Sequence, residues 1–132
     1  MEKATPFLMF EGNAEEAMKY YTSLIEEDSE ITSISRYGEN GPGKEGSVIQ
    51  ATFTLKGQEF MCIDSNIQHE FTFTPSFSIF LTCSSEAELD HLFKKLSEDG
   101  SVLMPLGDYS FSKKFAWTVD KFGVSWQLNL PN

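Results

Sequence analysis

The sequence lacks the long apolar run that a membrane-spanning helix needs. Such a helix takes about 20 consecutive apolar residues, and no apolar run in this chain of 132 residues approaches that length. Residues 1–6 also lack the basic stretch, apolar stretch and small-residue cleavage site of a secretory signal. We therefore expect no membrane partner and a cytoplasmic location.

Cysteine and basic residues are both scarce. Cys62 and Cys83 lie in apolar segments, which suits reduced, buried thiols, and nothing in the sequence requires a disulfide. The 10 Lys and Arg residues are outnumbered by 20 Asp and Glu residues, so the net charge is −10 at pH 7. A polyanion repels phosphate backbones, and we therefore expect no nucleic-acid partner.

The motifs of several enzyme classes are missing as well. The sequence has no Gly-x-Ser-x-Gly elbow, no Cys-x-x-Cys pair and no phosphate-binding loop. In contrast, apolar residues make up 40% of the chain and include 12 Phe, which is enough to build a core. The length and composition predict one folded domain over residues 1–132.

A strand, a turn and a helix occur twice, 72 positions apart. Residues 7–10 and 79–82 read as strands, and each is followed by a helix start of the capping-box type, Asn13 with Glu16 and Ser85 with Glu88. The apolar stripes of the two helices also coincide at this offset: Ala17, Tyr20, Tyr21 and Leu24, then Leu89, Leu92, Phe93 and Leu96.

A hairpin also occurs twice, at residues 54–63 and 120–129, where the offset is 66. The six extra residues of the first half fall in the glycine-rich loop 38–46. The chain therefore predicts an α+β fold of two tandem βαβββ modules, at about 6–64 and 76–130, joined by a connector at 65–75.

Three segments resemble the PhnB-like branch of the vicinal oxygen chelate superfamily, which includes glyoxalases, bleomycin-resistance proteins and dioxygenases. They are residues 7–17, residues 96–100 with 104–106, and residues 119–126. The resemblance implies two curled mixed sheets that form a cup around a ligand site, and a homodimer. Some PhnB-like proteins are labelled demethylubiquinone methyltransferases, but this sequence has no glycine-rich turn for a nucleotide cofactor.

Metal-dependent members of that superfamily place four ligands, usually His or Glu, on the first and last strands of each module. The resemblance puts these positions at Pro6, Met61, Ser78 and Gln127. None of the four residues is a His, Cys, Asp or Glu, which are the side chains that bind divalent cations well. We therefore expect no metal and no cofactor.

Strand alternation predicts which side chains line the cup. In the third strand of the second module, Thr118 is expected to face the cup, with Ala116 and Asp120, while Trp117 is expected in the core. Apolar walls with a few neutral hydrogen-bonding groups suit a small-molecule pocket, although a satisfied barrel interior or a dimer contact has the same composition. The predicted pocket residues are Gln50, Thr52, Met61, Ser78, Phe80, Thr118 and Gln127.

Three functions follow as hypotheses. The leading one is a metal-independent protein that binds an unknown small molecule and forms a homodimer. The second is a glyoxalase- or dioxygenase-type enzyme with a relocated site, whose candidate donors are Cys62, Asp64, His69 and Asp120. The third is a structural module whose role is dimerisation. The sequence identifies no catalytic residue.

Overall fold

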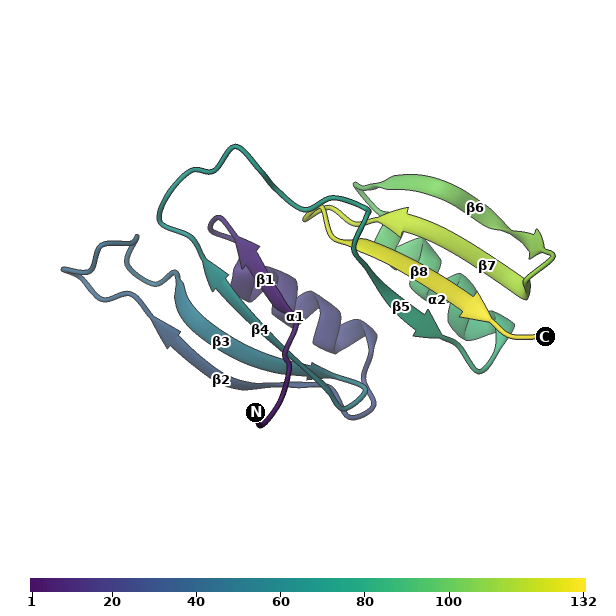
Figure 1. The fold of residues 1–132 in the computed structure, drawn as a ribbon, viewed down its shortest axis with the longest axis horizontal. Coiled ribbons are helices and arrows are strands. Elements are labelled where there is room, and N and C mark those ends of the chain that lie inside the picture. The colour runs from purple at the N-terminus through teal and green to yellow at the C-terminus, as the bar shows by residue number, and fades with distance from the viewer. The chain divides into compact units, whose positions relative to one another are not determined.

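The computed structural model describes residues 1–132 and divides them into two compact units, residues 1–69 and 70–132. Each unit contains one helix and one four-stranded mixed sheet (Figure 1). The predicted α+β architecture of two βαβββ modules is therefore confirmed. None of the helices has the length and apolar character that crossing a membrane requires.

The first unit has the strand order β1-β4-β3-β2. β1 runs parallel to β4, whereas β3 is antiparallel to both of its neighbours. Its elements, in chain order, are β1 (Phe7–Phe10), α1 (Ala14–Leu24), β2 (Glu30–Arg36), β3 (Val48–Leu55) and β4 (Gln58–Asp64).

The second unit repeats this topology with the strand order β5-β8-β7-β6. β5 runs parallel to β8, and β7 is antiparallel to both β8 and β6. Its elements are β5 (Ser78–Thr82), α2 (Glu86–Ser97), β6 (Ser101–Tyr109), β7 (Ser112–Val119) and β8 (Ser125–Leu130).

In each unit the helix packs on one face of its own sheet and buries the predicted apolar stripe there. In Figure 1 each helix lies behind its sheet. α1 buries Ala17 and Tyr21 of its stripe, and β3 and β4 add the stacked rings of Phe53 and Phe60, whose centroids are 5.3 Å apart. In the second unit Trp126 is fully buried. We call the sheet face that is turned away from its own helix the open face.

The two helices begin differently. Ser85 caps α2 as predicted, since its hydroxyl accepts from the Glu88 amide at 3.1 Å while the Glu88 carboxylate accepts from the Ser84 amide at 2.8 Å. The predicted cap at Asn13 is wrong, because its side chain makes no capping hydrogen bond. The free amides at the start of α1 bond to Asp64 instead.

The buried carboxylate of Asp64 holds three parts of the first unit together. Its Oδ1 accepts hydrogen bonds from the amides of Gly12 and Ala14, both at 2.9 Å, and its Oδ2 accepts from the amide of Val48 at 2.9 Å. Asp64 thus links the end of β4 to the β1–α1 turn and to the start of β3. Hydrogen bonds to a charged acceptor are about twice as strong as neutral ones.

A second buried carboxylate, Asp120, organises the turn between β7 and β8. Its Oδ1 accepts from the amides of Phe122 at 2.8 Å and Val124 at 3.0 Å. Its Oδ2 accepts from the indole nitrogen of Trp126 at 2.8 Å. The aspartate therefore fixes the turn and also satisfies the polar atom of the largest core side chain.

Replacing Asp64 by Asn should destabilise the protein. The amide nitrogen of Asn is a donor, so one of the three backbone amides would lose its acceptor in a buried place. We expect Asp64→Asn to lower the free energy of unfolding by about 2–4 kcal/mol in urea titrations. Asp108→Asn, at an exposed position on β6, is the matched control. A loss for Asp64→Asn no larger than that of the control would contradict this account.

Both thiols should be inert in the folded protein. Burial, together with the nearby Asp64, raises the pKa of Cys62 to about 12, and burial, with Glu88, raises the pKa of Cys83 to about 11. Both groups are therefore protonated at pH 8, and we expect Ellman's reagent to modify neither until urea unfolds the chain. Both pKa values lie above about 9, the value of a free thiol, so the unfolded chain releases these protons at a lower pH than the folded chain does. The free energy of unfolding should therefore fall as the pH rises above about 9. Rapid modification of the native protein would show that the thiols are accessible.

Candidate functional site

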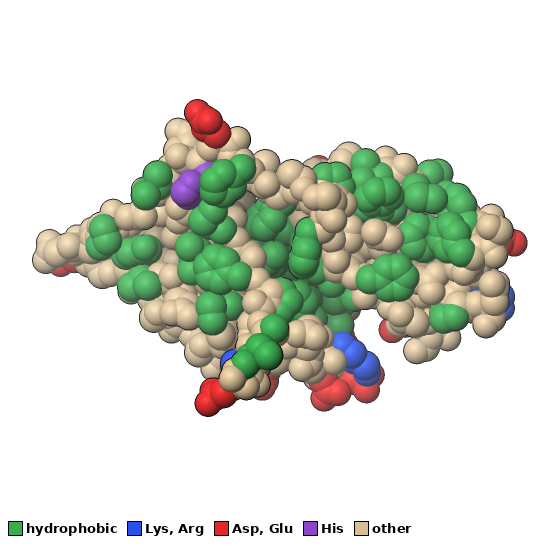
Figure 2. All heavy atoms as spheres, viewed as in Figure 1, with side chains coloured by type: hydrophobic (Ala, Val, Ile, Leu, Met, Phe, Trp, Pro, Cys, Tyr) green, Lys and Arg blue, Asp and Glu red, His purple; other side chains and the backbone are tan.

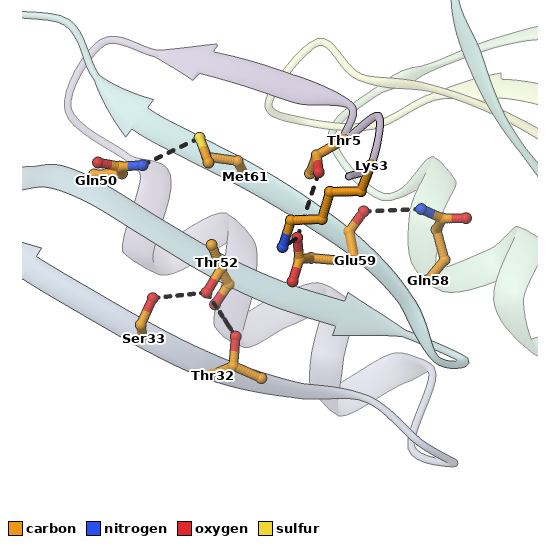
Figure 3. A network of polar contacts seen from close by, with 9 residues as sticks. All are labelled: Lys3, Thr5, Thr32, Ser33, Gln50, Thr52, Gln58, Glu59 and Met61. Atoms are coloured by element: carbon orange, nitrogen blue, oxygen red, sulfur yellow. Dashed lines mark hydrogen bonds and ion pairs between the residues drawn. The ribbon is translucent and has the colours of Figure 1, made fainter. Parts of the chain in front are cut away.

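On the open face of the first sheet, side chains from the three neighbouring strands β1, β4 and β3 form a neutral surface. Thr52 of β3 lies opposite Met61 of β4 in the antiparallel register, and Phe7 of β1 lies beside Met61 on its other side. The amide nitrogen of Gln50 donates to the thioether sulfur of Met61 at 3.2 Å (Figure 3). This surface therefore offers neutral donors and acceptors beside an apolar thioether.

A trio of hydroxyl groups extends this surface towards β2. The hydroxyl of Thr52 lies 2.6 Å from the hydroxyls of both Thr32 and Ser33 (Figure 3). Two consecutive residues reach one partner because the β2–β3 register shifts between Ile31 and Ser33, and such a bulge re-aims side chains. The trio can donate to or accept from a ligand without any formal charge.

An ion pair lies at the N-terminal end of β4. Lys3 bonds Glu59 at 2.8 Å, and the hydroxyl of Thr5 donates to the same carboxylate oxygen at 3.4 Å (Figure 3). The bond from Lys3 is the main cause that lowers the pKa of Glu59. Lys3 is well exposed and Glu59 is partly exposed, so the pair contributes little to stability.

The open face of the second sheet carries a second neutral cluster, centred on Ser125 of β8. Its hydroxyl lies 2.7 Å from the hydroxyl of Ser78 and accepts from the indole nitrogen of Trp117 at 2.8 Å. The side-chain amide of Gln127 donates to Ser78 at 3.3 Å. Phe80 lies beside Gln127 in the parallel β5–β8 register and is exposed.

Six of the seven predicted pocket residues therefore lie on open faces. The first sheet presents Gln50, Thr52 and Met61, and the second presents Ser78, Phe80 and Gln127. That the two faces line one cup stays a prediction.

The placement of Thr118 in the pocket is wrong. Thr118 has no exposed surface, and its hydroxyl bonds Ser97 of α2 at 2.8 Å and the Ser101 carbonyl at 2.9 Å, so it faces the helix. Ala116 shares that face, whereas Trp117, predicted in the core, pairs with Gln127 on the open face.

The turn length explains this error. Four residues separate the paired Thr54 and Glu59, but five separate the paired Val119 and Ser125. One extra residue in the second turn reverses the inward and outward positions of β7 relative to β3.

The assumed equivalence of Pro6 and Ser78 is wrong for a similar reason. Phe7 pairs with Met61, and Phe80 pairs with Gln127, so the first strands are offset by 73 although the helices are offset by 72. The counterpart of Ser78 is thus Thr5. Phe7, 53% exposed, lies on the open face, and Leu8 and Phe10 are buried towards the helix.

The residues at these positions do not fit a divalent metal ion. With Thr5 as the counterpart of Ser78, the four positions become Thr5, Met61, Ser78 and Gln127, and all four side chains are neutral. No group of three or more His, Cys, Asp or Glu side chains is arranged to hold a metal. Asp64 and Asp120 are both buried and already accept three hydrogen bonds each.

Sequence reasoning missed three members of these clusters, Thr5, Trp117 and Ser125. No motif marks a lone hydroxyl or indole as part of a site. Thr5 and Trp117 were displaced by the unrecognised differences in turn length. Ser125 is almost fully buried, and only the register shows that it joins Ser78 to Trp117.

Comparisons with known proteins agree on one family. Residues 2–129 match the family described as 3-demethylubiquinone-9 3-methyltransferase. A solved PhnB protein from Bacillus cereus is 67% identical, covers 98% of this chain and 99% of its own, and superposes with a TM-score of 0.94. The protein YjdN of Escherichia coli is 22% identical over 140 residues, which cover 96% of this chain and 93% of YjdN.

The fold also occurs outside that family. A glyoxylase/bleomycin resistance protein/dioxygenase domain from Frankia superposes with a TM-score of 0.68 over all of this chain and 98% of its own. Its identity is only 13%, so this likeness concerns the fold alone. It confirms the glyoxalase-like fold that the sequence predicts.

The neutral ligand-equivalent positions should leave the protein without bound metal. Untagged protein purified without chelator is expected to carry far less than one equivalent of any transition metal by inductively coupled plasma mass spectrometry. A metal that binds only the folded state raises the melting midpoint. Since we expect no such binding, added Zn²⁺, Mn²⁺ or Ni²⁺ should leave the midpoint unchanged. About one equivalent per chain would contradict the assignment and make a metalloenzyme the working description.

Proposed function

The chain belongs to the PhnB-like family described as 3-demethylubiquinone-9 3-methyltransferase, and from this membership we propose that it is a metal-independent small-molecule-binding protein. The proposal concerns the open faces of the two sheets, where Gln50, Thr52, Ser78 and Gln127 present hydrogen-bonding groups beside Met61 and Phe80. The ligand is expected to be a small molecule that these groups orient and that the apolar side chains desolvate.

The observation that carries the proposal is the chemistry at the ligand-equivalent positions. All four are neutral, and all four already take part in hydrogen bonds. Such groups recognise a ligand by geometry. They supply neither the carboxylate and imidazole ligands that a divalent ion needs nor a general base poised near neutral pH.

The name of the family does not decide the reaction. Methyl transfer from a nucleotide-type cofactor is typical of a doubly wound parallel sheet with a glycine-rich turn. Here each unit has one parallel strand pair and two antiparallel pairs, and no such turn follows β1 or β5. We therefore do not propose methyl transfer.

A relocated enzymatic site finds little support in the geometry. Three of its four candidate donors are buried, and the carboxylates of Asp64 and Asp120 are engaged by backbone and indole donors. The fourth, His69, lies in the connector, where its Nε2 is 2.8 Å from the hydroxyl of Ser65.

Two further properties belong to the proposal. We expect a homodimer, because each sheet exposes apolar side chains on a face that no element of its own unit covers, among them Phe7 and Phe80. A cytoplasmic location suits the two free, buried cysteines, since that compartment keeps thiols reduced.

A fragment screen monitored by NMR shifts tests the proposal. Compounds that shift amides of β4 or β8 are expected, and Gln127→Ala should weaken their binding about fivefold, the loss of one neutral hydrogen bond. Gln68→Ala, at an exposed connector position, is the matched control and should leave the affinity unchanged. If no compound of any class binds while sedimentation shows a stable dimer, a dimerising structural module replaces a binding protein.

A further inference from the structure

Four aromatic side chains gather on the second sheet around the β6–β7 hairpin. We call Phe80, Tyr109, Phe111 and Phe115 the aromatic platform. Tyr109 and Phe111 stack with centroids 5.7 Å apart and an interplanar angle of 14°, and both meet Phe115 edge-on, at 5.9 and 4.9 Å. Phe80 completes the group, 6.5 Å from Phe115. Figure 2 shows hydrophobic side chains gathered over this part of the second unit.

The platform is built rigidly. The Tyr109 hydroxyl donates to the Pro105 carbonyl at 2.8 Å, which fixes the ring. That ring lies over Gly107, where an added Cβ would come within 3.3 Å of it, so the glycine provides the space. Phe115 is only 3% exposed and forms the floor.

Two members of the platform keep large exposed surfaces. Phe80 is 54% exposed and Phe111 is 60% exposed. Exposed ring surface is costly in water, and fixed rings offer a flat apolar contact without losing side-chain freedom on binding. Ordered rings that are partly exposed suit a planar ligand that stacks against them or meets their edges.

One cation lies beside the platform. Lys113 stands two residues before Phe115 on β7, so alternation places it on the same face, roughly 7 Å along the strand. It is exposed and forms none of the ion pairs of this chain, whereas its neighbour Lys114 bonds Glu86 at 2.8 Å and Asp90 at 2.7 Å on α2. In a chain of net charge −10, an unpaired ammonium beside fixed rings selects a negatively charged group.

We infer that the aromatic platform with Lys113 is a binding site for planar aromatic carboxylates. The ring of the ligand lies against Phe80 and Phe111, and its carboxylate meets the Lys113 ammonium. The side-chain amide of Gln127 lies beside Phe80 in the β5–β8 register and can meet a polar ring substituent. This inference rests on the proposed function and names the ligand class for the second open face.

The equivalent face of the first unit supports this assignment by contrast. In register, the counterparts of Phe115 and Trp117 are Gln50 and Thr52, both polar. The first open face carries the exposed ring of Phe7, the counterpart of Phe80, but it has no aromatic floor in place of Phe115, so we assign ring binding to the second unit.

The test is an NMR titration of the full chain with three probes, 2-naphthoate, 2-naphthol and cyclohexanecarboxylate. The expected result is that 2-naphthoate binds tightest and shifts the amides of residues 111–115, since only it has both a flat ring and a carboxylate. Phe111→Ala should weaken its binding about fivefold, and Lys113→Gln about threefold.

Matched controls separate the site from general surface effects. Phe71→Ala removes a phenylalanine that is 62% exposed in the connector, and Lys94→Gln removes an exposed lysine on α2. Neither should change the affinity for 2-naphthoate. All four substitutions are at exposed positions, and unchanged melting midpoints will show that the variants are folded.

The failures of the two proposals are distinguishable. If fragments bind elsewhere on the open faces but 2-naphthoate binds no better than cyclohexanecarboxylate, the aromatic site is overturned and the binding function stands. Unchanged affinity in both Phe111→Ala and Lys113→Gln also overturns it. If 2-naphthoate does not bind and Phe111→Ala dissociates a dimer in sedimentation, a second copy of the chain occupies the platform.

Discussion

The buried carboxylate of Asp64 is the interaction on which the first unit depends. Its three backbone hydrogen bonds join the end of β4 to the turn before α1 and to the first residue of β3. They fix the register that puts Met61 between Phe7 and Thr52, and so they define the open face. A charge buried at this depth is tolerated because every bond it makes is to a backbone donor that would otherwise lack an acceptor. Asp120 has the corresponding role in the turn that precedes β8.

The architecture could be predicted from the sequence because its signals are local. The helix stripes, the Ser85 cap and the glycine turns each depend on residues a few positions apart, and the duplication gave every signal twice. The helix start at Ala14 was harder to interpret, since the side chain that satisfies it comes from residue 64, and no local pattern shows a cap supplied from 50 residues away.

The orientation of side chains in β1 and β7 could not be predicted from the repeat alone. Strand alternation has a period of two, so a single extra residue in a turn exchanges the two faces. The first unit has one such extra residue before α1, where Gly12 adopts a positive φ of 117°, and the second unit has one between β7 and β8. Thr118 and Trp117 therefore exchanged places relative to expectation, whereas Met61 and Gln127, on strands whose offset was read correctly, did not.

The extra residue between β7 and β8 also has an evolutionary consequence. An insertion of one codon in this turn leaves the helix and the strand pairing intact, yet it exchanges the two faces of β7. A duplicated gene can thus present a new set of side chains to a ligand in one half by a single event, while the face turned to the helix adapts to its new residues. Sequence alignments that place the gap a few positions away would transfer the functional residues of such halves to the wrong side of the sheet.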